Sequence, residues 1–135
     1  MKKADMIKTV ICKTIPTKQG KRQNGEIIEL KKDGDRTEVY LSTIYPHSFK
    51  GYHKHTKQDI EIYCLSGSVL MRIYSPDKSL YINAFYAGEK LLIPKEHTIG
   101  IENNTEETVK LLVFPTPFYD PKDPEQENFT REEIE

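Results

Sequence analysis

The sequence has almost no net charge, no long apolar run, no tryptophan and only two cysteines, and these shortages exclude several classes of protein. Lysine and arginine number 20 against 21 acidic residues, so the net charge of −1 gives no support to a nucleic-acid or membrane-surface partner. No apolar run approaches the roughly 18–20 residues that span a bilayer, and the early "MIKTVICKTI" is interrupted by charge. Tryptophan is absent, and the two cysteines, Cys12 and Cys64, are far apart and lack metal-binding spacing. These shortages predict a reduced, soluble protein of the cytoplasm with no nucleic-acid or membrane partner.

What the sequence does contain is a series of short β-favouring runs. With 135 residues, the chain suits one domain that has a hydrophobic core of its own. Turn signals recur about every 8–12 residues, and no long helical period separates them. The runs occupy residues 6–15, 26–32, 37–45, 60–65, 69–74, 81–86, 90–94, 98–103 and 108–114. The Asp-Gly pair in "KDGD" supplies the positive φ of a tight hairpin, and the whole pattern predicts an all-β sandwich or small barrel.

The end of the chain has a different composition. The stretch "YDPKDPEQENFTREEIE" (119–135) is interrupted by proline and then becomes acidic. Thr130 ahead of "REEIE" predicts the cap of one short helical turn. We therefore expect a barrel domain over residues 1–118, followed by a loosely packed tail over residues 119–135.

Two histidines one residue apart, in "GYHKH" (51–55), give the strongest chemical signal. Residues i and i+2 of a strand share a face, so His53 and His55 would present their imidazoles side by side inside a small barrel. His97 follows a separate β-run and is expected in the same pocket. Imidazole is a common metal ligand and also a proton acceptor near neutral pH, so both chemistries are open. The remaining histidine, His47, is expected to be an ordinary surface or core residue.

The stretch 51–103 resembles the two sequence motifs of the cupin superfamily. The first motif, Gly then His-x-His then an acid and a Gly, is matched by "GYHKH" and by Gly67. The second motif is matched by Gly88, Pro94, His97 and Asn103. The resemblance implies a cupin-type, jelly-roll-like β-sandwich in a single domain, and a homodimer.

Within that superfamily the chain is similar to enzymes related to dTDP-4-dehydrorhamnose 3,5-epimerase and to the dTDP-sugar 3,4-ketoisomerases. Four landmarks carry the similarity, in the same order: "NGEIIEL", "FKGYHKH", "CLSGSV" and "YDPKDPE". The similarity implies an epimerase or ketoisomerase that acts on a nucleotide-linked 4-keto-6-deoxy sugar in surface polysaccharide synthesis. The reaction that the similarity implies requires no cofactor, because a histidine removes the acidic proton beside the carbonyl.

The similarity also suggests roles for individual residues. His53 matches the family's base, and His55 matches the second histidine of the ketoisomerases. Lys50 replaces the arginine that precedes the glycine of the motif, and Lys50, His97 and Tyr63 are expected to bind the substrate. The family's tyrosine acid has no match in "LLVFPTP". Candidates for that acid on other strands are Tyr45, Tyr63, Tyr74 and Tyr86.

The position of the acidic residue that follows His55 distinguishes the metal-free, histidine-mediated mechanism from a metal-dependent one. Leaving three residues after His55 reaches Asp59 and leaving four reaches Ile60, whereas Glu61 would face the pocket only if the strand were bulged. One alternative is therefore a metal-dependent cupin enzyme, an oxygenase or a metal-assisted epimerase. Its divalent metal would be held by His53, His55, His97 and Asp59, or by Glu61 in a bulged strand. A second alternative is a non-catalytic cupin that binds a sugar or another small molecule.

Overall fold

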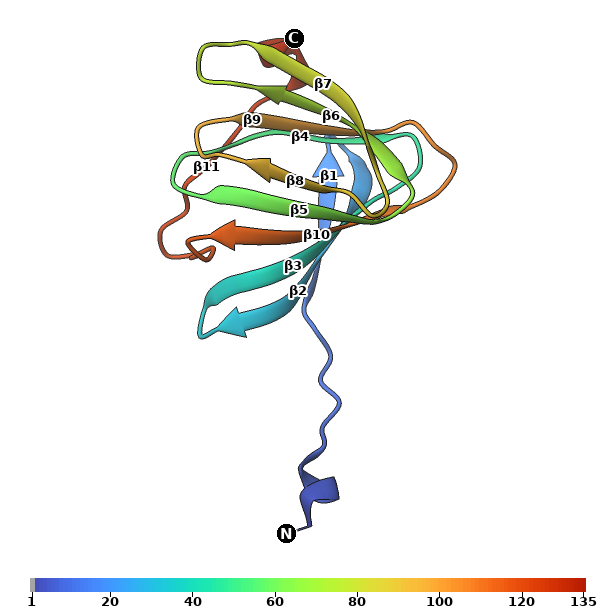
Figure 1. Ribbon diagram of the computed structural model, residues 1–135, viewed down its shortest axis with the longest axis vertical. Coiled ribbons are helices and arrows are strands. Elements are labelled where there is room, and N and C mark those ends of the chain that lie inside the picture. Colours follow the sequence, from blue (N-terminus) through green and yellow to red (C-terminus); the bar gives the residue numbers. More distant parts are fainter. Residues whose placement is uncertain (1) are drawn as a thin grey trace.

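Two antiparallel sheets form the protein in the computed structural model, which describes residues 2–135. The six-stranded sheet has the order β1 (Thr14–Gln19), β2 (Arg22–Asp33), β3 (Arg36–Ile44), β10 (Val109–Thr116), β5 (Asp59–Ser66) and β8 (Lys90–Ile93). The five-stranded sheet has the order β11 (Gln126–Asn128), β4 (Ser48–His55), β9 (Thr98–Asn103), β6 (Ser68–Tyr74) and β7 (Leu80–Tyr86). Figure 1 shows the strands stacked into a sandwich that closes toward a barrel. The predicted all-β, cupin-type sandwich is confirmed.

The core lies between the sheets because the strands alternate buried and less buried residues, as a period of two requires. In β5 the buried positions are Ile60, Ile62 and Cys64, and β6 and β10 show the same alternation. These side chains join one hydrophobic cluster that also includes Met71 and Leu111, both fully buried. The sequence pattern thus sets the spacing of the core-facing residues on these strands.

The predicted hairpin at "KDGD" is confirmed. Asp33 pairs with Arg36, and Gly34 has a φ of 61°, in the left-handed region that glycine adopts without strain. The β-run expected over residues 6–15 is wrong for most of its length, because η1 (Lys3–Met6) and an extended segment precede β1, which starts at Thr14. The apolar residues of the extended segment are not buried against the sheets. Ile7, for example, is 81% exposed, and Figure 1 shows the segment extending away from the sandwich.

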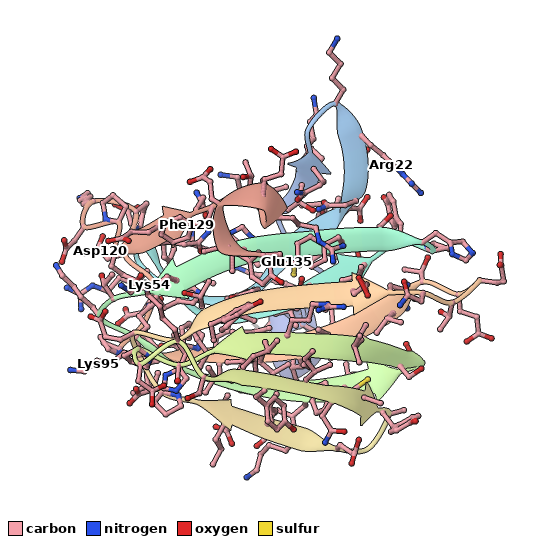
Figure 2. All side chains as sticks on the ribbon, turned by 90° about the horizontal axis from the view of Figure 1, so that it is seen from above. Arg22, Lys54, Lys95, Asp120, Phe129 and Glu135 are labelled. Carbon is pink, nitrogen blue, oxygen red and sulfur yellow. The ribbon has the colours of Figure 1, made fainter. Side chains whose placement is uncertain are left out.

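The C-terminal stretch 119–135 is a structured part of the same body, and not the loosely packed tail that its composition suggests. Its strand β11 pairs with β4, and Phe129 exchanges two backbone hydrogen bonds of 2.9 Å with Tyr52. The predicted cap is confirmed, because Thr130 forms a capping box with Glu133 at the start of α1 (Arg131–Ile134). Figure 2 shows Phe129 and Glu135 on this segment, where it lies over β4. The sandwich therefore continues past residue 118.

Exposed apolar residues lie along the edge strand β7, where Leu80, Ile82 and Tyr86 are 44%, 47% and 57% exposed. Such edges are commonly covered by a partner, and the homodimer expected from the family resemblance stays a prediction. Within residues 2–135, neither η1 nor α1 has the length and apolar character needed to cross a membrane.

A close contact between β9 and β4 gives a test of the packing beneath the pocket. A Cβ at Gly100 would lie 2.5 Å from Cε1 of Tyr52 and 2.9 Å from Cζ of Phe49. Tyr52 is fully buried, so its ring has no free space to move into. We expect Gly100→Ala to lower the free energy of unfolding by about 1–3 kcal/mol, measured by urea denaturation. Gly20→Ala meets no atom within 4 Å and adds only the strain of a left-handed φ of 61°, about 1 kcal/mol, so a loss at Gly100 no larger than the loss at Gly20 would contradict this packing.

Candidate functional site

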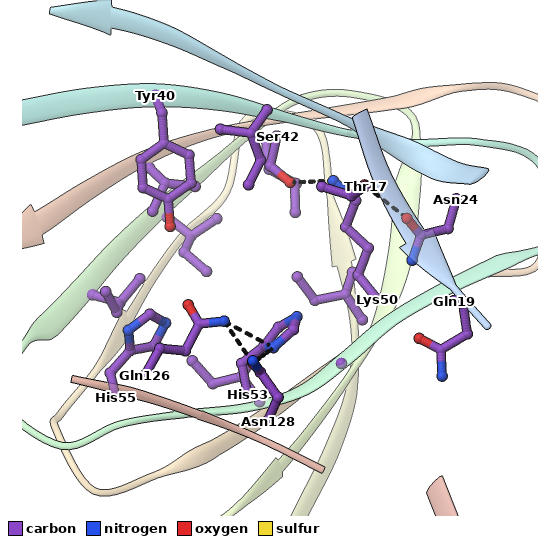
Figure 3. Close-up of a pocket in the computed structure, with 18 of the residues that line it drawn as sticks. Thr17, Gln19, Asn24, Tyr40, Ser42, Lys50, His53, His55, Gln126 and Asn128 are labelled. Atoms are coloured by element: carbon purple, nitrogen blue, oxygen red, sulfur yellow. Dashed lines mark hydrogen bonds between the residues drawn. The ribbon is translucent and has the colours of Figure 1, made fainter. Parts of the chain in front are cut away.

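A cavity of about 310 Å³ opens between the sheets. Figure 3 shows polar residues that line it: Tyr40 and Ser42 come from β3, Lys50, His53 and His55 from β4, and Gln126 and Asn128 from β11, with further ones from β1 and β2. Its remaining walls include apolar side chains of the core, among them Ile60 and Leu111. Within residues 2–135 no acidic side chain lines this cavity. The two predicted catalytic histidines thus share one pocket whose formally charged lining residues are basic.

His53 is held in one orientation by two amide side chains. Its Nδ1 lies 2.6 Å from Oδ1 of Asn128, and Nε2 of Gln126 donates to that same oxygen at 2.7 Å. Nε2 of Gln126 also lies 3.1 Å from Nδ1 of His53, but the shorter contact is to an amide oxygen, which can only accept. This contact assigns the proton to Nδ1 and leaves a lone pair on Nε2. Burial lowers the pKa of His53, the hydrogen bond to Asn128 opposes this, and the charges of His55 and Lys50 lower it further. His53 is therefore a neutral imidazole at pH 7.

His55 has a buried carboxylate as its partner. Its Nδ1 lies 3.2 Å from Oε1 of Glu125, whose residue is only 8% exposed. The other oxygen of Glu125 accepts a hydrogen bond of 3.1 Å from the backbone N–H of Thr56, which fixes the carboxylate. A carboxylate beside Nδ1 selects the tautomer whose Nε2 is free, and it stabilises the ring when Nε2 takes up a proton.

Glu125 was not predicted, because it lies in the stretch that composition marked as a tail. No spacing rule connects residue 125 with residue 55. Only the pairing of β11 with β4 brings them together, with Gln126 opposite His55 and Asn128 opposite His53.

Lys50 is a buried cation, and no carboxylate of residues 2–135 forms an ion pair with it. It is 5% exposed, and its Nζ donates to the backbone oxygen of Glu26 at 3.1 Å and to Oγ of Ser42 at 3.0 Å. Burial lowers the pKa of Lys50 to about 8, against a smaller opposing effect of the Glu26 charge. Gly25 leaves the space for this side chain, since a Cβ there would lie 2.9 Å from Cε of Lys50. An unpaired buried charge favours a ligand that carries the opposite charge.

The structure does not bring His97 or Tyr63 into the cavity, so the expectation that three histidines share one pocket is wrong. His97 is half-buried in the turn before β9, with its Nδ1 3.2 Å from the backbone oxygen of Lys95. Tyr63 lies on the outer face of β5, where it donates to Oε1 of Glu61 at 2.7 Å and packs against Phe114.

The alternation of inward-facing and outward-facing side chains along β5 determines where the proposed metal ligands lie. Ile60 takes the inward position, and Asp59 and Glu61 face outward. Asp59 accepts a hydrogen bond of 2.8 Å from the backbone of Lys95, and the pairing of β5 with β8 runs without a bulge over residues 60–63. Among residues 2–135 no group of three His, Cys, Asp or Glu side chains is placed to hold a metal ion. The residues present therefore do not match the metal site of the first alternative.

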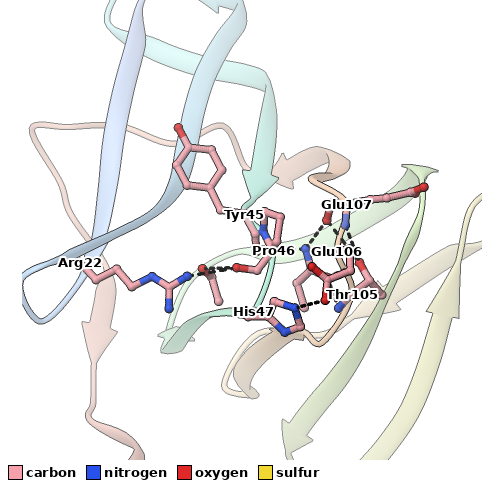
Figure 4. A network of polar contacts seen from close by, with 9 residues as sticks. Arg22, Tyr45, Pro46, His47, Thr105, Glu106 and Glu107 are labelled. Atoms are coloured by element: carbon pink, nitrogen blue, oxygen red, sulfur yellow. Dashed lines mark hydrogen bonds and ion pairs between the residues drawn. The ribbon is translucent and has the colours of Figure 1, made fainter.

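None of the four candidate tyrosines lines the cavity, whereas Tyr40 does. The hydroxyl of Tyr45, for example, is directed to Glu26 at 3.1 Å. Tyr40 was missed because nothing in its local sequence distinguishes it from a packing tyrosine of β3. His47 lies at the surface as expected, where its Nε2 contacts Glu106 at 2.6 Å (Figure 4).

The fold and the site together define a cupin-type β-sandwich with a histidine-lined interior pocket, as the motifs in residues 51–103 predicted. No family model matches the sequence. The chain is 28% identical to the "Probable low-salt glycan biosynthesis epimerase Agl13" of Haloferax volcanii, over 78% of this chain and 77% of that protein.

Two solved structures are similar in fold. The capsular polysaccharide assembling protein CapF of Staphylococcus aureus matches with a TM-score of 0.72 and 22% identity, over 90% of this chain but only 33% of CapF. Oxalate decarboxylase OxdC of Bacillus subtilis matches with a TM-score of 0.60 and 18% identity, over 73% of this chain and 27% of OxdC. The chain thus spans about a third or less of these larger proteins, and the likeness to them concerns the fold.

The buried ammonium gives a pH-dependent prediction. Lys50 loses its proton near pH 8 in the folded protein but near 10.5 when unfolded, so between these values the unfolded state binds more protons. The free energy of unfolding contributed by this group therefore rises with pH across that window, by about 2–3 kcal/mol in total. We expect Lys50→Met to flatten this rise in urea denaturation at pH 7 to 10.5. Lys8→Met, at an exposed position, should keep the wild-type slope, and an unchanged slope in Lys50→Met would contradict the burial of a charge.

Proposed function

We propose that this protein is an epimerase or ketoisomerase of a nucleotide-linked 4-keto-6-deoxy sugar, and that it acts by histidine-mediated proton transfer in surface polysaccharide synthesis. The observation that carries the proposal is the pair of imidazoles on one wall of the cavity, each with a partner at Nδ1 and with Nε2 free to accept a proton. The names of two similar proteins, a probable glycan biosynthesis epimerase and a capsular polysaccharide assembling protein, support the same class.

The chemistry requires a base with a pKa near neutrality, because the protons beside a ketone are weakly acidic. Removal of one such proton by Nε2 of His55 gives an imidazolium ring, and the buried carboxylate of Glu125 compensates its charge. His53 has only amide partners, and the positive charges of Lys50 and His55 disfavour a second charge there. We therefore assign the base role to His55, although the family resemblance assigns it to His53, and we assign the positioning of the sugar to His53.

The charge distribution supports a phosphorylated substrate. Lys50 supplies a buried ammonium that has no carboxylate partner in the described part of the chain, and Lys18 lies at the rim of the same cavity. A diphosphate that links the sugar to a nucleoside would neutralise these charges. The sugar would then lie deeper, between the histidines and β3. This arrangement does not need a metal ion, and the outward-facing acids of β5 offer no ligand for one.

Solvent exchange tests the proposal directly. The protein is incubated in D₂O with dTDP- and UDP-linked 4-keto-6-deoxy sugars, and deuterium at the ring carbons is followed by NMR and mass spectrometry. We expect incorporation at a carbon beside the carbonyl, and we expect His55→Asn to reduce its rate about 1,000-fold. His47→Asn, at the surface, is the matched control and should retain the wild-type rate. Absence of incorporation in every sugar tested would favour the non-catalytic, sugar-binding alternative.

The Glu125 carboxylate gives a second prediction. Glu125→Gln keeps the size of the side chain but removes the charge that stabilises protonated His55. The amide of the variant must direct its NH2 group at one of the two donors that the carboxylate now accepts from, so the unfolding midpoint in urea should fall, and we expect the exchange rate of the folded variant to fall about 100-fold. Glu127→Gln, which alters an exposed carboxylate of the same strand, should leave the rate unchanged. Equal rates for Glu125→Gln and wild type would contradict the assignment of His55 as the base.

A further inference from the structure

The two histidines of β4 have chemically different partners in the C-terminal stretch. Nδ1 of His55 lies 3.2 Å from a carboxylate oxygen of Glu125, just before β11. Nδ1 of His53 lies 2.6 Å from the amide oxygen of Asn128, the last residue of β11. The segment that completes the site thus gives a negative charge to one imidazole and only a neutral acceptor to the other.

Gln126 determines which end of the Asn128 amide faces His53. Its Nε2 donates a hydrogen bond of 2.7 Å to Oδ1 of Asn128. An amide NH2 group cannot accept a hydrogen bond, so the oxygen of Asn128 has to be the atom that faces Gln126. The same oxygen accepts from Nδ1 of His53, and Figure 3 shows the three side chains gathered at this point. Two amides from one short strand therefore fix the tautomer of His53.

The surroundings of His53 offer a positive charge no compensation. Within residues 2–135, the titratable side chains that line the cavity beside it are Lys18, Tyr40, Lys50 and His55. The two residues that the neighbouring strand β9 contributes to the lining are apolar. Burial lowers the pKa of His53, and the hydrogen bond to Asn128 opposes this lowering without reversing it. The ring therefore remains neutral although it lies two residues from His55.

We propose that Asn128 is the positioning residue that assigns proton transfer to His55, because it keeps His53 a neutral hydrogen-bond acceptor. This inference rests on the proposed function and specifies which of the two histidines reacts. A carboxylate at position 128 would stabilise an imidazolium at His53, as Glu125 does at His55. An amide of the same shape orients the ring without supplying that charge.

The two rings then act on one sugar in different ways. Residues i and i+2 of a strand are about 7 Å apart, so a single sugar ring can contact both imidazoles. At His55 a C–H bond beside the carbonyl breaks, the proton goes to Nε2, and the electron pair moves to the carbonyl oxygen. At His53 the lone pair of Nε2 accepts a hydrogen bond from a ring hydroxyl, and no proton is transferred.

NMR signals of the histidine rings test the inference without a substrate. In protein labelled with ¹⁵N-histidine we expect His53 to titrate below its ordinary pKa of 6.5 and, when neutral, to carry its proton on Nδ1. Asn128→Asp should raise the pKa of His53, because a carboxylate stabilises the imidazolium. Asn83→Asp adds the same charge at an exposed position of β7, on the opposite edge of the sheet, and should leave this titration unchanged.

A gain of activity tests which histidine is the base. His55→Asn alone is expected to reduce deuterium exchange into the 4-keto-6-deoxy sugars about 1,000-fold. Adding Asn128→Asp gives His53 a carboxylate partner, and we expect exchange to recover about 10-fold or more from the level of the single variant. Asn83→Asp in the same His55→Asn background should restore nothing. A purely structural role of Asn128 predicts no such gain.

The outcomes separate this inference from the proposed function. A wild-type His53 that titrates above 6.5, or that carries its proton on Nε2 when neutral, would overturn the inference at any level of activity. Folded Asn128→Asp with an unchanged pKa at His53 would also overturn it, as would failure to restore exchange in His55→Asn when the wild-type protein exchanges. Absence of exchange in the wild-type protein with every sugar would overturn the proposed function, whereas the NMR titration shows separately whether Asn128 holds His53 neutral.

Discussion

The pairing of β11 with β4 is the interaction on which the site depends. Three residues of β11, separated from β4 by about 70 positions in the chain, place Gln126 opposite His55 and Asn128 opposite His53. Asn128 contacts the imidazole of His53, and Glu125, next to the strand, supplies the buried carboxylate for His55. A strand so short contributes few ladder hydrogen bonds, so further contacts must hold it in position.

That anchoring comes from the end of the chain. The guanidinium carbon of Arg131 lies 4.4 Å from the ring centroid of Phe49, and its Nη1 lies 3.2 Å from Oε2 of Glu102. The hydroxyl of Tyr52 donates to the carboxylate of Glu135, and the Tyr52 ring is packed against Gly100 of β9. These contacts attach the segment after β11 to β4 and β9. The positions of the histidine partners are therefore coupled to the stability of the C-terminal turn.

The two buried charged side chains of the interior, Glu125 and Lys50, have different surroundings. The negative charge is compensated by its neighbours, whereas the positive charge is not. Glu125 is compensated by His55 and by a backbone N–H, whereas Lys50 donates only to an uncharged carbonyl and a hydroxyl. Burial without a counter-ion costs stability, and an anionic ligand bound beside Lys50 would recover that cost. A ligand with a charged end and a ketone at the other would thus be oriented before any proton moves.

The sequence by itself determined the alternation of buried and exposed side chains along the strands, the hairpin at Gly34 and the cap at Thr130. It also determined that two imidazoles share one face of a strand. All of these features depend on local periodicity and turn chemistry. It also carried the cupin resemblance. Tertiary structure decided which side of each strand meets the pocket. A period of two fixes that Asp59 and Glu61 share a face, but only pairing with β8 and β10 turns that face outward. In the same way, Glu125 and Tyr40 became site residues through contacts between strands that are distant in the chain, and no local pattern records such contacts.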